Sequence, residues 1–244
     1  MKLTFIGTSH GVCEPNRKCS SCFLETGGRF YVVDMGCDIM PDLINRGRKP
    51  SDITAIFITH PHGDHVNGLV PFTNQCSWCY TKIDPLILLP EMSIRDALSY
   101  YMETALHLPL RPSLRFEEYK EGCIYDDGIL RVTAVSNGHM PNSYSLLFEA
   151  DGKRVLFTGD LSSDVGPITD FARMNTGEPL DLAVVESVHF DPDLYTEPVR
   201  KNPPKRMFIT HYSSYTMEKC CRFIEKMKNE VPMVLLTDGY EVTV

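Results

Sequence analysis

Three histidines and an aspartate lie within six positions of the segment FITHPHGDHVNGL (57–69). Such side chains rarely fill a protein core without partners. In an extended segment residues two apart point to the same side, so the first two histidines can converge on one point. The glycine that follows allows a sharp turn that brings the aspartate and the third histidine to the same point. Imidazoles and a carboxylate in this arrangement predict a site for zinc, with manganese and iron as second choices. The four residues are His60, His62, Asp64 and His65.

Three more candidate ligands each follow a strand-like run elsewhere in the chain. His139 lies in VSNGHMPNSY, Asp160 ends LFTGD, and His211 lies in FITHYSS. Functional groups of α/β proteins gather where strands run out into loops. Together with the histidine cluster, these side chains supply what two divalent metal ions need. The predicted metal ligands are therefore His60, His62, Asp64, His65, His139, Asp160 and His211.

The elements that must position these ligands are mostly strands. Short apolar runs ended by turn residues predict strands, and Asp151-Gly152 between two of them predicts a hairpin. Helical periodicity is clearest over 93–107 and 216–230, and a shorter helix is expected near His65. Because strands outnumber helices and hairpins mix with longer crossovers, we expect an α/β layer architecture with mixed sheets. The predicted strands are 3–7, 21–26, 29–36, 53–59, 85–90, 129–135, 144–150, 153–159, 182–187, 206–210, 233–237 and 240–244.

Composition limits the other possibilities. The chain has 244 residues, 43% of them hydrophobic, which suits a single domain over residues 1–244. No run approaches the length of a membrane span and no export signal is visible, so we expect a cytoplasmic protein without membrane contact. The net charge of −8 argues against broad nucleic-acid binding. Nine cysteines fit reduced thiols. The spacings Cys19–Cys22 and Cys76–Cys79 also match a structural zinc site, which we favour less.

The series HPHGDH, then His139, TGD with Asp160, and His211 resembles the motif signature of the metallo-β-lactamase fold. That resemblance covers most of the chain and implies a four-layer αββα sandwich of two mixed β-sheets, with a dinuclear metal site on one edge. It implies that His60, His62 and His139 hold one ion, that Asp64, His65 and His211 hold the other, and that Asp160 bridges them.

Within this superfamily the chain looks most like ribonuclease Z and its small-molecule phosphodiesterase relatives. The similar segments are FIGTSHGV, NRKCSSCFLETGGRFYVVDMG, GHMPNSYSLLF, ITHYSS and TDGYEVTV. Two departures matter. Ribonuclease Z carries a further histidine just ahead of the last ligand motif, and here 196–208 has none. The family's tRNA-gripping arm is also not evident, because helix and strand patterns occupy 66–138.

Both departures favour a small substrate. We expect a metal-dependent hydrolase that cleaves phosphodiester bonds with a hydroxide activated by two metal ions, on small or cyclic nucleotides. A ribonuclease Z-type tRNA 3′-processing endonuclease is the first alternative. A glyoxalase II-like thioester or lactone hydrolase is the second. A metal-binding domain without a productive pocket is the non-enzymatic alternative, and a homodimer stays open.

The remaining site residues have assigned roles as hypotheses. Asp64 would orient the hydroxide and accept its proton. His189, in ESVHFDP, is the candidate general acid, or else an ordinary hydrogen-bonded loop histidine. Asp34, in VVDMG, would orient a ligand histidine, or else form a turn. Candidate contacts for phosphate oxygens flank the ligand motifs, and they are Ser143, Tyr144 and Ser213.

Overall fold

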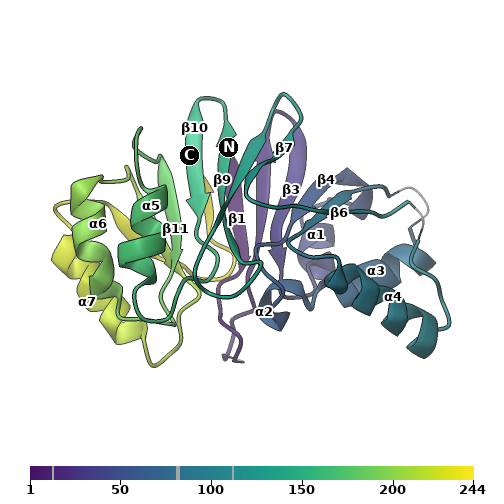
Figure 1. Ribbon diagram of the computed structural model, residues 1–244. Coiled ribbons are helices and arrows are strands. Elements are labelled where there is room, and N and C mark those ends of the chain that lie inside the picture. Colours follow the sequence, from purple (N-terminus) through teal and green to yellow (C-terminus); the bar gives the residue numbers. More distant parts are fainter. Residues whose placement is uncertain (13, 81–82, 112) are drawn as a thin grey trace.

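Two seven-stranded mixed sheets pack face to face in the computed structural model, which describes residues 1–12, 14–80, 83–111 and 113–244 (Figure 1). The first sheet has the order β14-β1-β2-β3-β4-β5-β6 and the second the order β13-β12-β11-β10-β9-β8-β7. The strands of the first sheet are β1 (Lys2–Gly7), β2 (Ser21–Thr26), β3 (Arg29–Met35), β4 (Ile53–Phe57), β5 (Leu86–Leu89), β6 (Arg115–Glu118) and β14 (Glu241–Thr243). Those of the second are β7 (Gly122–Asp126), β8 (Arg131–Ser136), β9 (Tyr144–Ala150), β10 (Lys153–Phe157), β11 (Leu182–Glu186), β12 (Met207–Thr210) and β13 (Met233–Leu235).

Helices cover the outer face of each sheet, so the molecule has the predicted four layers (Figure 1). Outside the first sheet lie α1 (Met40–Asn45), α3 (Leu69–Trp78) and α4 (Ser93–Ala105), with the short α2 (Gly63–Val66) at its edge. Outside the second lie α5 (Ala172–Met174), α6 (Thr196–Lys201) and α7 (Met217–Met227). Short helical turns complete the fold at η1 (Pro50–Asp52), η2 (Pro167–Phe171) and η3 (Pro192–Tyr195).

Three apolar cores hold these layers together. The central core joins the inner faces of the two sheets and includes Phe5, Phe57 and Phe148. A second core lies between the first sheet and its helices, and a third between the second sheet and its helices. Burying one face of each sheet against the other and the opposite face against helices removes most apolar side chains from water. The arrangement confirms the predicted αββα sandwich.

The predicted hairpin at Asp151-Gly152 is confirmed. It joins β9 to β10, and its two residues have φ values of 54° and 67°. Both values are left-handed, as the favoured two-residue hairpin turn requires. The strand predictions missed β6 and β7, and no helix was expected at α1, α3 or α6. Among the described residues no helix is long and apolar enough to cross a membrane.

Candidate metal centre

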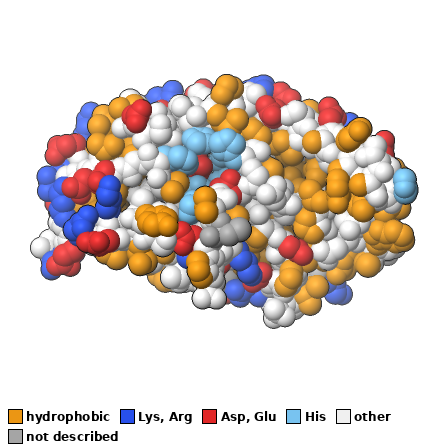
Figure 2. Space-filling model, turned by 90° about the horizontal axis from the view of Figure 1, so that it is seen from below, with side chains coloured by type: hydrophobic (Ala, Val, Ile, Leu, Met, Phe, Trp, Pro, Cys, Tyr) orange, Lys and Arg blue, Asp and Glu red, His pale blue; other side chains and the backbone are white. Residues whose placement is uncertain are grey.

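The seven predicted ligands meet at one edge of the sandwich, where β4, β8, β10 and β12 run out into loops. Figure 2 views this edge and shows the histidines gathered around acidic side chains at the surface. Their ligand atoms form two groups that share Asp160, and within each group all atoms lie within 4.8 Å of one another. The first group is His60, His62, His139 and Asp160, and the second is Asp64, His65, Asp160 and His211.

Asp160 lies at the middle of the cluster. Its Oδ2 is 3.6 Å from Nε2 of His60, 3.7 Å from Nε2 of His139 and 3.2 Å from Nε2 of His211. Its Oδ1 is 3.3 Å from Nε2 of His65. One carboxylate therefore faces imidazoles from both sheets, since His60 and His65 follow β4 whereas His139 and His211 follow β8 and β12.

On the first sheet, hydrogen bonds to Nδ1 turn the other ring nitrogen of two histidines toward the centre. His60 Nδ1 lies 3.1 Å from Thr59 Oγ1, and His65 Nδ1 lies 2.8 Å from Asp34 Oδ2. Asp34 has a left-handed φ of 55° and accepts the Thr59 amide at 2.8 Å. A carboxylate that fixes the far nitrogen of a ligand histidine sets its tautomer and orientation. Asp34 thus makes the contact with His65 that the orienting role requires, and the role itself stays a prediction.

The position of α2 depends on a close contact between its backbone and the backbone just past β3. A Cβ added to Gly36, just past β3, would lie 1.7 Å from the carbonyl oxygen of Asp64. Only glycine leaves room for that contact. Asp64 and His65 are thereby held against the end of the strand that carries Asp34.

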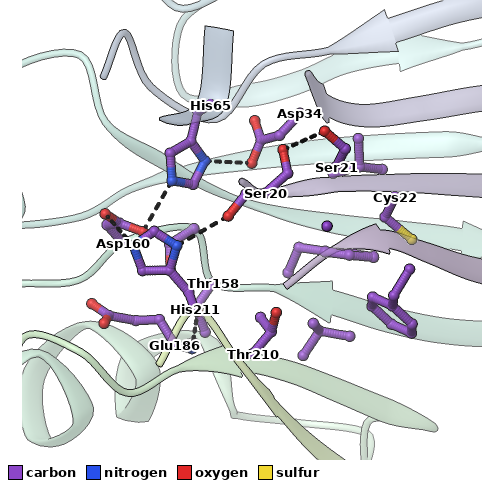
Figure 3. Close-up of a pocket in the computed structure, with 16 residues that line it drawn as sticks. Ser20, Ser21, Cys22, Asp34, His65, Thr158, Asp160, Glu186, Thr210 and His211 are labelled. Atoms are coloured by element: carbon purple, nitrogen blue, oxygen red, sulfur yellow. Dashed lines mark hydrogen bonds and ion pairs between the residues drawn. The ribbon is translucent and has the colours of Figure 1, made fainter. Parts of the chain in front are cut away.

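On the second sheet, the ligand histidines are oriented in the same way. His139 Nδ1 lies 3.3 Å from the Leu161 carbonyl oxygen, and His211 Nδ1 lies 3.0 Å from Ser20 Oγ. His211 also has a left-handed φ of 48°, and its amide donates to the Thr8 carbonyl at 2.9 Å. Figure 3 shows His65 and His211 both pointing at Asp160, with Asp34 and Ser20 behind them. The cavity of about 40 Å³ in that view lies between the sheets beneath these ligands.

The residues fit a metal site. Nε2 of His60, Nε2 of His65 and Oδ1 of Asp160 are buried and make no hydrogen bond of regular geometry with the described residues. A buried polar atom without such a bond costs about 1–3 kcal/mol. Three of them converging on one space, with lone pairs of the kind that zinc binds, is the pattern of a preformed ligand set.

The electrostatics of the cluster are those of closely packed opposite charges. Burial, with the neighbouring His65, holds the pKa of His60 well below its usual value, so its imidazole is neutral. Burial also opposes charge on His65, yet Asp34 and Asp160 raise the pKa of His65 well above its usual value. The Asp160 pKa lies well below its usual value, because His211 and His65 outweigh the effect of burial.

A second pair of side chains approaches the cluster from β11. His189 Nδ1 lies 2.9 Å from Oε1 of Glu186 and 3.9 Å from Oδ2 of Asp160, and its ring centroid is 4.8 Å from that of His139. Glu186, the last residue of β11, is buried and also accepts the Leu161 amide at 2.7 Å. The sequence interpretation singled out His189 but missed Glu186, Thr59 and Ser20.

The three predicted phosphate contacts are all buried and stay predictions. Ser143 precedes β9, and its Oγ makes no hydrogen bond with the described residues. Tyr144 packs in the central core, with its ring centroid 5.0 Å from that of Tyr119. Ser213 Oγ accepts the amide of Thr216 at 3.1 Å. In the described ranges Cys22, Cys37, Cys76, Cys79, Cys123, Cys220 and Cys221 are free thiols, and none of the metal-ligand groups found there contains a cysteine.

Two mixed sheets packed face to face, with this cluster of candidate ligands at their strand ends, define a protein of the metallo-β-lactamase fold class. Within that class the chain belongs to the family of Anti-Pycsar protein Apyc1, whose model matches residues 1–227.

Similar proteins support the predicted ribonuclease Z-like branch. A protein of Listeria innocua serovar 6a named ribonuclease Z is 30% identical over 193 residues, which cover 75% of this chain and 61% of that protein. Ribonuclease Z of Anoxybacillus flavithermus is 26% identical, with 98% of this chain and 96% of that protein covered. The crystal structure of the short form of human tRNase Z is 22% identical and covers 100% of this chain and 99% of that one, with a TM-score of 0.76. This chain thus spans only about three fifths of the Listeria relative.

Proposed function

We propose that this chain hydrolyses phosphodiester bonds in small substrates of the cyclic-nucleotide type, using two divalent ions, preferably zinc. His60, His62 and His139 would hold one ion, Asp64, His65 and His211 would hold the other, and Asp160 would bridge them. The observation that carries the proposal is the Asp160 carboxylate, whose oxygens lie 3.2–3.7 Å from imidazole nitrogens of both sheets. Imidazole and carboxylate donors suit zinc, with manganese and iron as second choices.

Such a pair of ions, when bound, supplies an activated water and neutralises charge on the phosphoryl oxygens. The side chains do the rest. Asp64 Oδ2 lies 3.6 Å from Nε2 of both His65 and His211, so its carboxylate faces the same space as the ligand nitrogens. In that place it would orient the attacking water and accept its proton.

His189 would give a proton to the leaving oxygen. Its Nδ1 is held by Glu186, which leaves Nε2 as the nitrogen that carries a transferable proton. An alkoxide is a poor leaving group without a proton. A thiolate leaves more easily, because the pKa of its thiol is about 8.5. A held proton donor beside the metal cluster therefore favours phosphodiester cleavage over the glyoxalase II-like alternative.

The surface around the site favours a small substrate over a polynucleotide. The chain has a net charge of −8, and phosphate backbones are bound by clustered lysines and arginines. Figure 2 shows mainly apolar and uncharged atoms around the histidines, with most of the basic side chains farther out and mixed with acidic ones. Processing of tRNA 3′ ends stays the second candidate function, because curated relatives carry the name ribonuclease Z.

Four substrates test the proposal on protein loaded with zinc or manganese. We expect hydrolysis of bis(p-nitrophenyl) phosphate and of cyclic nucleotides, and little of S-lactoylglutathione. Asp64→Asn should lower both phosphodiesterase rates by at least about 100-fold. Cleavage of precursor tRNA with no turnover of cyclic nucleotides would support the second candidate instead. Turnover of the thioester alone would overturn the assignment of the bond.

A further inference from the structure

Tyr215 lies four residues past the candidate ligand His211 and presents its ring to solvent. Its 92% exposure is the highest of the large hydrophobic side chains that the structure describes. Val12, in the segment after β1, and Met217, the first residue of α7, are 67% and 47% exposed. We name this surface, formed by 10–12 and 213–217, the aromatic rim.

The backbone that carries Tyr215 is held on both sides. The Ser213 amide donates to Thr216 Oγ1 at 3.0 Å, and the Thr216 amide donates to Ser213 Oγ at 3.1 Å. Between them, the Ser214 amide donates to Glu14 Oε1 at 2.9 Å. A fixed backbone beneath an unpacked aromatic ring is a preorganised contact surface, since tyrosine offers a large area and loses little side-chain entropy.

A short series of contacts connects the rim to the metal ligands. Glu14 Oε1 lies 3.3 Å from His10 Nε2, and the ring centroids of His10 and His211 are 6.3 Å apart. A Cβ added to the neighbouring Gly11 would lie 3.4 Å from the Asp64 carboxylate. The loop that anchors Ser214 therefore also lines the space in front of Asp64.

The exposed Tyr215 ring is a flat apolar surface, and the guanidinium of Arg17, which contacts the neighbouring Tyr212, is already engaged. The Arg17 guanidinium donates to the carbonyl oxygens of Thr8 and Tyr212 and lies 3.8 Å from the centre of the Tyr212 ring. An exposed aromatic ring can bind another flat ring by stacking, and this contact does not depend on phosphate.

We propose that Tyr215 determines specificity by stacking on a flat ring of the substrate, such as a nucleobase, while the metal centre holds the phosphodiester. This inference rests on the proposed function and adds the part of the substrate that the metal ligands do not recognise. Stacking of one base contributes about 1–3 kcal/mol, which corresponds to about a 5- to 150-fold change in kcat/KM.

The test compares two substrates on metal-loaded protein: a cyclic nucleotide and a cyclic ribose phosphate that lacks a base. We expect Tyr215→Leu to lower kcat/KM for the cyclic nucleotide about 5- to 150-fold, mainly through KM, and to leave the base-free substrate within about twofold. Tyr215→Phe should keep the wild-type preference. Tyr100→Leu is the matched control, because Tyr100 is 72% exposed on α4, far from the centre (Figure 1).

The possible outcomes distinguish a failure of this inference from a failure of the proposed function. Equal losses of kcat/KM on both substrates would mean that Tyr215 only supports the loop. No loss on either substrate would mean that the ring does not contact the substrate. Each result overturns the inference while phosphodiesterase activity stands. Wild-type protein that cleaves bis(p-nitrophenyl) phosphate but prefers no base also overturns it. Metal-loaded protein without any phosphodiesterase activity would refute the proposed function itself.

Discussion

At the scale of single residues, the site depends on how each imidazole is held. Four of the five candidate ligand histidines have Nδ1 near an oxygen: Thr59 for His60, Asp34 for His65, the Leu161 carbonyl for His139 and Ser20 for His211. This leaves Nε2 facing Asp160 in each case. Proteins use such outer contacts to set ligand geometry, so the residues behind the cluster matter nearly as much as the ligands.

Asp34→Asn tests one of those outer contacts. Asparagine tolerates the left-handed backbone at this position, so the change removes the charge beside His65 without adding backbone strain. We expect the affinity for one of the two ions to fall about 10- to 100-fold, measured by competition with a chelating dye. Asp96→Asn, exposed on α4, is the control. Unchanged affinity for both ions would contradict the orienting role.

His189→Asn tests the proton donor through the leaving group. With a cyclic nucleotide, whose leaving oxygen is an alkoxide, we expect kcat to fall about 100- to 10,000-fold. With bis(p-nitrophenyl) phosphate the fall should be much smaller, because p-nitrophenolate leaves without a proton. Metal content should not change. His107→Asn, at an exposed position, serves as control. Equal losses on both substrates would mean that His189 has another role.

The sequence predicted the candidate metal ligands better than the residues that hold these ligands in place. HPHGDH carries its own geometry, since residues two apart on an extended segment share a side, and the structure brings its four ligand residues together with His139, Asp160 and His211. Glu186, Thr59 and Ser20 could not be singled out in this way. Their roles arise only where β11, β4 and β2 approach the cluster, and short polar residues at strand ends are common. The one available signal was that Glu186 is charged at the end of an apolar run, where a buried carboxylate needs partners.

At the scale of elements, all the buried strands were predicted, and both missed strands are exposed edge strands, although the edge strands β13 and β14 were predicted. β4 and β11 are continuous apolar runs and were found, whereas β6 (RFEE) and β7 (GCIYD) lie at the edges of their sheets and expose much of their length. An edge strand needs no apolar face, so its sequence carries little periodic signal. α3 contains Pro71 in its first turn and shows weak amphipathicity. For these reasons the sequence did not predict this helix.

Asp127, just past β7, joins the two sheets and gives a stability prediction. It accepts hydrogen bonds from the amides of Ile129 and Leu130 and from the hydroxyls of Tyr31 and Tyr125, and it pairs with Arg29. Burial opposes the charge, but these donors, with the Leu130 amide first, hold the pKa of Asp127 well below its usual value. A lowered folded pKa stabilises the fold above the unfolded pKa near 3.8, and this contribution is lost as the pH falls through the folded pKa.

We therefore expect Asp127→Asn to cost about 1–3 kcal/mol at pH 7 and less at pH 3, measured by urea unfolding at both pH values. Asp126→Asn is the control, because the neighbouring Asp126 is half exposed, pairs at the surface with Arg131 and accepts the Gly128 amide, which an asparagine oxygen can also accept. A cost of the same size at both pH values would show that the charge of Asp127 does not carry the effect.

At the scale of the whole molecule, the candidate ligands come from both sheets. His60, His62, Asp64 and His65 belong to the first, and His139, Asp160 and His211 to the second. Bound ions would therefore tie the two halves of the sandwich together, in addition to the central core between them. A ligand that binds only the folded state stabilises it by mass action.

Metal removal should thus lower the melting temperature. At free metal about 100 times the dissociation constant the stabilisation is about 2.7 kcal/mol, which for a chain of this size corresponds to roughly 5–10 °C. Scanning calorimetry of loaded and chelator-treated protein measures the difference. Asp160→Asn should abolish most of it. Equal melting temperatures for loaded and stripped wild-type protein would show that no ion joins the sheets.

Ligands drawn from both halves also connect this protein to the supply of metal in a cell. A fold that lacks 1–2 kcal/mol of stability is recognised more often by proteases, and its abundance drops several-fold. If the ions bind as proposed, starvation for zinc would reduce the amount of this protein as well as its rate per molecule. The concentration of this protein would then follow the zinc supply of the cell without a dedicated regulatory protein.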